Sequence, residues 1–176
     1  SKDIRQFIST IKNYTLDKDA EIVLCPNYID LPNVSKLIKD YDNIKLGSQD
    51  VSINSSGAFT GDVSVEMLTN IDCKYSIIGH SERRFNYNET DFAINEKLKV
   101  VNRSLVNPII CIGETIEEKE SESTFDVIAN QLNTIFNNIE IFSHKKYLIA
   151  YEPRWAIGTG VAADIQSIKS VSSFIK

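Results

Sequence analysis

Glu152 is the residue of this sequence that is best placed to act as a general base. It follows the apolar run 147–151, which has the length and composition of a buried strand, and it stands where the connection to the next helix begins. In parallel α/β folds, catalytic side chains gather at the carboxyl ends of the strands. The position therefore indicates a catalytic carboxylate, and a solvated loop glutamate is the plain alternative.

The residues that follow this glutamate have the composition of a lid. Pro153 fixes one backbone torsion at the exit of the strand, and Trp155 and Ile157 provide apolar side chains that can cover a bound ligand. Gly158 and Gly160 offer bare backbone amides and a hinge. We expect this loop to exclude water from the site, although such glycines also occur in ordinary turns.

A second motif places a histidine at the end of another apolar run. Residues 75–78 are followed by Gly79 and His80, and then by Ser81 and Glu82, where a helix can begin. The unpaired N–H groups of a helix N-terminus create a positive field, which favours neutral imidazole over imidazolium. A neutral ring can donate a hydrogen bond to a carbonyl oxygen without carrying charge, so this position is typical of an electrophile.

The positions of both motifs depend on an alternation of helical and strand-like segments. Five strands are expected, at 22–25, 44–47, 75–78, 108–111 and 147–151. Helices are expected at 3–14, 31–41, 64–68, 89–104 and 165–176, and the stretch 115–137 is expected to be mostly helical. This rhythm is typical of a parallel α/β fold, in which eight such units close a barrel.

Four segments of the sequence resemble the triosephosphate isomerase family, in the order that the family has. They are Ser56–Asp62, which is similar to the family's Gly-Ala-Phe-Thr-Gly-Glu loop, the histidine motif Ile78–Arg84, the segment Cys111–Thr115 and the glutamate motif Ala150–Gly160. The resemblance implies a (β/α)8 TIM barrel, of which residues 1–176, as a single partial domain, represent about five of the eight βα units. The resemblance covers the family from just after its first strand to a point within its sixth helix.

The resemblance implies an active site that interconverts dihydroxyacetone phosphate and D-glyceraldehyde 3-phosphate through an enediol(ate), in glycolysis and gluconeogenesis, without a cofactor or a metal. In this role Glu152 moves the proton between the two carbons, and His80 polarises the carbonyl group. Ser81 and Glu82 would support the active site, and pairing with a neighbouring arginine is the alternative for Glu82. Contacts of the lid and the substrate phosphate are implied for Trp155, Ile157, Gly158, Thr159 and Gly160.

The same resemblance implies a homodimer. In the family, the loop that corresponds to residues 50–62 inserts into a second subunit, which would place Phe59 and Thr60 at the contact; an ordinary surface connection is the alternative. Asp50 stands where asparagine is usual, and Arg154 where valine or leucine is usual. The family's Asn-Trp-Lys-Met-Asn segment, which carries its catalytic lysine, does not occur in these 176 residues. A truncated or noncatalytic relative that serves as an assembly or binding module is therefore the second hypothesis.

The charge and composition of the sequence argue against several classes of binding partner. The formal net charge of −5 argues against nucleic acid, which requires clustered Lys and Arg, and it leaves the capture of a phosphorylated substrate to local backbone N–H groups. There is no apolar stretch of transmembrane length, and the first residues lack the apolar core of a secretion signal. We therefore expect a cytoplasmic protein without a membrane partner. The odd number and wide spacing of Cys25, Cys73 and Cys111 favour reduced thiols. Cys25 and Cys111 lie in apolar strand-like runs, where a cysteine usually packs as a small core residue, and no metal site is expected.

Overall fold

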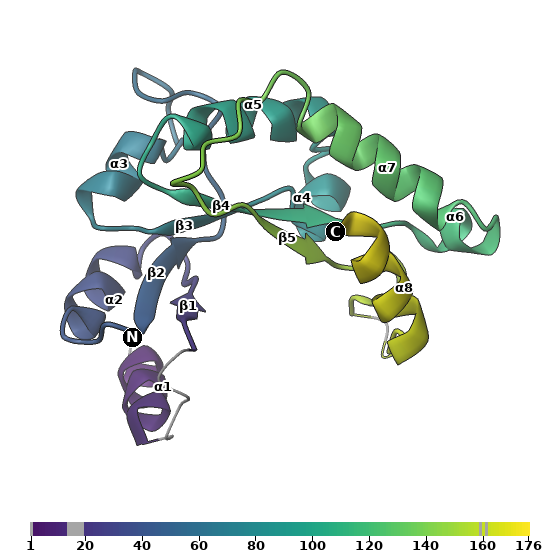
Figure 1. The fold of residues 1–176 in the computed structure, drawn as a ribbon. Coiled ribbons are helices and arrows are strands. Elements are labelled where there is room, and N and C mark those ends of the chain that lie inside the picture. The colour runs from purple at the N-terminus through teal and green to yellow at the C-terminus, as the bar shows by residue number, and fades with distance from the viewer. Residues whose placement is uncertain (1, 14–19, 159, 161) are drawn as a thin grey trace. The chain divides into compact units, whose positions relative to one another are not determined.

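The computed structural model describes residues 2–13, 20–158, 160 and 162–176, in which helices and strands alternate (Figure 1). Their contacts divide the chain into two compact units. The first consists of residues 1–77 and 100–108, and the second consists of residues 78–99 and 109–176. The glutamate motif and the histidine motif Ile78–Arg84 both belong to the second unit.

The first unit is built around two parallel strand pairs. It holds α1 (Lys2–Asn13), β1 (Ile22–Leu24), α2 (Leu31–Ile38), β2 (Ile44–Ser48), α3 (Val65–Asn70) and most of β3 (Tyr75–Ile78). In the strand registers, Ile22 lies opposite Ile44 and Gly47 lies opposite Tyr75. Leu31 and Leu68 are among its fully buried side chains, so α2 and α3 each bury an apolar face in the core of this unit.

The second unit carries the strand ends that matter for the site. It holds α4 (Ser81–Asn86), most of α5 (Asp91–Asn102), most of β4 (Asn107–Ile112), α6 (Ile116–Glu120), α7 (Thr124–Ile135), β5 (Leu148–Tyr151), the 3-10 helix η1 (Arg154–Ala156) and α8 (Ile165–Ile175). β4 and β5 pair in parallel, with Cys111 opposite Ala150. Ile94, Ile110, Ile112 and Ile128 are completely buried, which fixes the sheet against the helices that cover it.

The five predicted strands are confirmed, and they follow one another in the sheet in the order β1-β2-β3-β4-β5. The stretch 115–137 is divided into α6 and α7 because Glu122 adopts a left-handed backbone conformation, with φ of 58°, which a right-handed helix cannot contain. Within the described parts of the chain, no helix combines the length and the apolar composition needed to cross a bilayer.

Candidate active site

His80 is the N-cap residue of α4, and its ring is anchored to the helix backbone. Its Nδ1 accepts a hydrogen bond from the backbone N–H of Glu82 at 3.3 Å. A ring nitrogen that accepts a hydrogen bond carries no hydrogen, so the neutral ring has its hydrogen on Nε2. His80 therefore offers a single N–H donor of fixed orientation at the end of β3.

Glu152 directly follows β5, and its carboxylate is held at the start of α4. Its Oε1 accepts a hydrogen bond from the backbone N–H of Ser81 at 2.7 Å. Its Oε2 lies 3.4 Å from the Ser81 hydroxyl and 3.4 Å from His80 Nε2. The structure thus brings together three of the predicted site residues, His80, Ser81 and Glu152, from two strand ends that are far apart in the sequence.

Arg84 locks the backbone that carries His80. Its guanidinium donates from Nε to the Gly79 carbonyl at 2.8 Å and from Nη2 to the Cys111 carbonyl at 3.0 Å, and Nη1 pairs with Asp91 at 2.6 Å. Gly79 has a φ of 74°, and an added Cβ would lie 2.7 Å from a side-chain carbon of α5. Only glycine fits there, so the turn from β3 into α4 has one well-defined shape.

A buried carboxylate links α4 to α5. Glu89, whose side chain is 5% exposed, lies 2.6 Å from Arg83 Nε and 2.8 Å from Lys97 Nζ. The contact with Lys97 is close but not aligned as a hydrogen bond, so it is an ion pair. One carboxylate between two cations thus connects Arg83 of α4 with Lys97 of α5.

The backbone of Glu152 is positioned by the loop that follows β4. The Glu152 N–H donates to the Ile112 carbonyl at 2.9 Å, and Gly113 approaches the Glu152 carbonyl so closely that any Cβ would collide with it. The buried amide of Gln131 holds Gly113 from the other side, because its Oε1 accepts from the Gly113 N–H at 2.9 Å and its Nε2 donates to the Gly113 carbonyl at 3.1 Å. Gln131 therefore acts as a clamp on the loop against which Glu152 rests.

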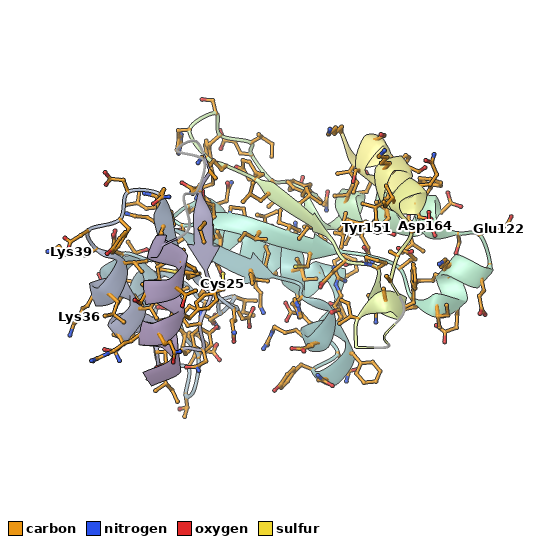
Figure 2. All side chains as sticks on the ribbon, turned by 90° about the horizontal axis from the view of Figure 1, so that it is seen from below. Cys25, Lys36, Lys39, Glu122, Tyr151 and Asp164 are labelled. Atoms are coloured by element: carbon orange, nitrogen blue, oxygen red, sulfur yellow. The ribbon has the colours of Figure 1, made fainter. Side chains whose placement is uncertain are left out.

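The tryptophan of the predicted lid is anchored to a buried carboxylate. Trp155 Nε1 donates to Glu114 Oε1 at 2.8 Å, and the hydroxyl of Tyr151 lies 3.1 Å from both oxygens of Glu114. Figure 2 labels Tyr151 on β5. Burial, and then the negative charge of Glu114, raise the pKa of Tyr151 well above its usual range, so its hydroxyl remains a donor. Lys119 Nζ lies 3.3 Å from the centre of the Trp155 ring and adds a cation–π contact.

A cavity of about 390 Å³ adjoins this arrangement, between α4, the start of α6 and η1. Ser81, Phe85, Trp155 and Ile157 are among its lining residues. The cavity is therefore in contact with both the residue that holds Glu152 and two apolar residues of the predicted lid.

The remaining predicted site residues have distinct positions. Glu82 contributes its backbone N–H to His80, whereas its side chain is 73% exposed, with Oε2 3.9 Å from His80 Nδ1. Gly158 and Gly160 both adopt left-handed conformations, with φ of 72° and 74°, and nothing crowds them. Thr159 lies outside the described residues. Phe59 and Thr60 are exposed in the loop that precedes α3, in the first unit.

Sequence reasoning did not identify four positioning residues of this site: Arg84, Glu89, Glu114 and Gln131. The alternative partners considered for Glu82 are engaged elsewhere, since Arg83 pairs with Glu89 and Arg84 with Asp91. Glu114 lies within one of the four family-like segments, and that was the available signal for its role. Among the described residues, no group of three or more His, Cys, Asp or Glu side chains is arranged to hold a metal ion.

The fold and site define an α/β protein that presents a carboxylate and an imidazole at the carboxyl ends of parallel strands. The family profile of triosephosphate isomerase matches residues 1–176. The chain is 43% identical to a triosephosphate isomerase of Alkaliphilus metalliredigens, over 97% of this chain and 68% of that relative. It is 39% identical to one of Alkaliphilus oremlandii, over 100% and 71%, and 42% identical to one of Dictyoglomus thermophilum, over 98% and 68%. The chain belongs to the triosephosphate isomerase family.

Family membership confirms the predicted fold class, a (β/α)8 TIM barrel of which the chain holds about five βα units. The five strands and the intervening helices are consecutive units of that architecture. The chain spans about two thirds of the length of the relatives named above.

Proposed function

We propose that this chain interconverts dihydroxyacetone phosphate and D-glyceraldehyde 3-phosphate through an enediol(ate). The observation that carries the proposal is the meeting of Glu152 and His80, with Oε2 and Nε2 3.4 Å apart, in a member of this family. The reaction needs one base for a carbon-bound proton and one donor for the adjacent oxygen, and these two groups supply both.

Glu152 removes the proton beside the carbonyl group and returns it to the neighbouring carbon. In the arrangement described here its carboxylate is occupied by the Ser81 N–H. To reach a substrate carbon, the carboxylate must exchange that hydrogen bond for a position facing the substrate. The base of this reaction is therefore a group that moves between two positions.

His80 donates its Nε2 hydrogen to the substrate oxygen on which negative charge develops. Because Nδ1 is held by the Glu82 N–H, the ring needs no reorientation when the charge appears. Once that hydrogen has passed to the enediolate oxygen, Nε2 takes up the hydrogen of the neighbouring hydroxyl group, so the ring ends the step in its original state. Ser81 supports the site through its contacts with Glu152.

Because the chain has a net negative charge, its overall charge does not attract an anionic substrate. Local backbone N–H groups therefore bind the phosphate. The left-handed turns at Gly158 and Gly160 are typical of segments that point several backbone N–H groups at one anion. Trp155 and Ile157, which belong to the same segment, would exclude water from the reacting carbons.

We further propose that the protein is a cytoplasmic homodimer that uses the loop 50–62. Ile53 and Phe59 are 49% and 48% exposed in this loop, so it offers two apolar side chains to a second copy. Ser52 closes the base of the loop through its hydroxyl contact with Asp62 at 2.5 Å. A loop that is closed at its base and exposes apolar side chains is suited to insertion into a second copy of the chain.

The proposed cytoplasmic location is in keeping with the cysteines. All three are present as thiols, which is typical of a reducing compartment.

An isomerase assay of the intact polypeptide tests the proposal. Purified protein is supplied with dihydroxyacetone phosphate, and D-glyceraldehyde 3-phosphate is detected by a coupled oxidation, with Glu152→Gln as the matched control. We expect product from the parent protein and almost none from the variant, with the same circular dichroism spectrum for both. A well-folded parent that forms no product would contradict the proposal and favour an assembly or binding module.

A further inference from the structure

Arg154 is the only charged residue in the segment 153–158, and it occupies the first position of η1. Its backbone N–H donates to the Glu114 carbonyl at 2.9 Å, so the start of the lid segment is tied to the loop after β4. Its side chain lines the cavity of about 390 Å³ described above. An uncharged residue at this position would not bring a positive charge to the cavity.

Glu117 lines the same cavity from the first turn of α6. The start of this helix is rigid, because Thr115 and Glu118 form a reciprocal capping box. The pKa of Glu117 is lowered, first by its own backbone N–H, then by the Thr115 hydroxyl, and further by the positive charge of Arg154. A carboxylate at the start of α6 and a guanidinium at the start of η1 therefore line one cavity and attract each other, and Glu82 adds a second carboxylate to the cavity wall.

We propose that Arg154 is a positioning residue that draws the lid segment 154–157 toward α6 through its attraction to Glu117. The inference rests on the proposed isomerase function, in which this segment closes over the substrate. In the arrangement described here, Trp155 is bonded to Glu114 and Glu152 is bonded to Ser81. The attraction thus favours the resting arrangement, in which the base does not face the substrate.

The size of the effect follows from the exposure of the two groups. Attraction between exposed charges is weak and is screened by salt, so it shifts a two-state equilibrium by about fivefold at most. When a protein is partly held in a state that does not bind, its apparent affinity falls in proportion to the competent fraction. Loss of the attraction should therefore lower KM by about two- to fivefold and make KM less sensitive to ionic strength.

The first part of the test measures the fluorescence of Trp155, which reports on the surroundings of its ring. Trp155 is the single tryptophan of the 176 residues. Arg154→Met keeps the aliphatic stem and removes the charge, Glu117→Gln removes the opposite charge, and Glu120→Gln is a matched control on the same helix outside the cavity. We expect the first two variants to change the fluorescence of Trp155 and to abolish its response to added salt. The double variant should equal either single variant, because both remove one shared interaction.

The second arm reads KM and kcat separately for the same variants in the intact polypeptide. We expect Arg154→Met and Glu117→Gln to lower KM to the same extent, Arg154→Lys to restore the parent value, and Glu120→Gln to have no effect. Additive effects of Arg154→Met and Glu117→Gln, or parent-like fluorescence and KM in both, would overturn the proposal. Because the fluorescence arm needs no turnover, absence of isomerase activity would refute the proposed function without deciding the role of Arg154.

Discussion

Two strand ends in the second unit hold their functional groups in opposite ways. At the end of β3, His80 is anchored by the backbone of α4, and Arg84 ties the Gly79 carbonyl of the turn to β4 and to the start of α5. At the end of β5, the carboxylate of Glu152 is held through its own oxygens, and the following Trp155 through one indole N–H. The first group is fixed by contacts that a substrate cannot replace, whereas the second is held by contacts that can be exchanged.

This difference matches what each group has to do in the proposed reaction. A donor that stabilises developing charge is most effective when it is oriented in advance. A base that serves two carbons, and a lid that admits and releases substrate, must be able to change position. We infer that catalysis is divided between a rigid electrophile, His80, and a mobile base, Glu152. Each variant below removes one of these two groups or a contact that positions it or the lid.

The largest effect is expected from the mobile side. Glu152→Gln removes the base but keeps the shape of the side chain, so kcat should fall on the order of 10³-fold while the fold is unchanged. Glu152→Asp retains the base but withdraws it by about 1 Å, and kcat should fall about 10²-fold. Steady-state kinetics measure both values, and turnover near that of the parent in the Gln variant would remove Glu152 from the mechanism.

A slightly smaller effect is expected from the rigid side. His80→Gln keeps a polar side chain but loses the preorganised Nε2 donor, so kcat should fall by about 10²–10³-fold. Because the donor acts on charge that develops in the transition state, KM should change little. If KM rises and kcat stays constant, His80 binds the substrate and does not polarise its carbonyl group.

Loosening the turn around His80 should cost mainly stability. Arg84→Met leaves the carbonyl groups of Gly79 and Cys111 and the carboxylate of Asp91 without their partner, which should reduce the free energy of unfolding by about 3 kcal/mol. Arg103→Met, at an exposed position, is the matched control and should have little effect. Denaturant unfolding measures the difference, and equal stability of the two variants would show that Arg84 does not brace this turn.

The smallest effect is expected from the anchor of the lid. Trp155→Phe retains an aromatic ring but removes the N–H that is bonded to Glu114. The equilibrium population of the open lid should therefore rise by about tenfold. Cleavage of the lid segment by a protease at low concentration measures this opening. Similar protection in the parent and in Trp155→Phe would mean that the bond to Glu114 does not hold the lid.

The sequence predicts those parts of the fold that depend on the local pattern of apolar and polar residues. The apolar runs before His80 and Glu152 predict strands, and parallel strands bring their carboxyl ends to one edge, so the meeting of the two residues follows from the topology. The division of the stretch 115–137 was not evident, because it depends on the left-handed backbone of Glu122, a residue that gives no turn signal.

The contacts that position the site could not be predicted, because they join side chains to backbone groups distant in the sequence. Gln131 clamps the backbone of Gly113, and Arg84 bonds the carbonyl of Cys111. A glutamine on a helix and an arginine near its start are common residues that give no indication of such partners. Their roles emerge only when the packing of α4 and α7 against the end of β4 is known.

A crystal structure of the intact polypeptide with a phosphorylated two-carbon carboxylate, which mimics the enediolate, tests the division into a rigid and a mobile group most directly. We expect the carboxylate of Glu152 to leave the Ser81 N–H and face the ligand. His80 Nδ1 should remain bonded to the Glu82 N–H, and the guanidinium of Arg84 should keep its contacts. A bound ligand with Glu152 still on Ser81, or with the His80 ring turned away from Glu82, would contradict the account.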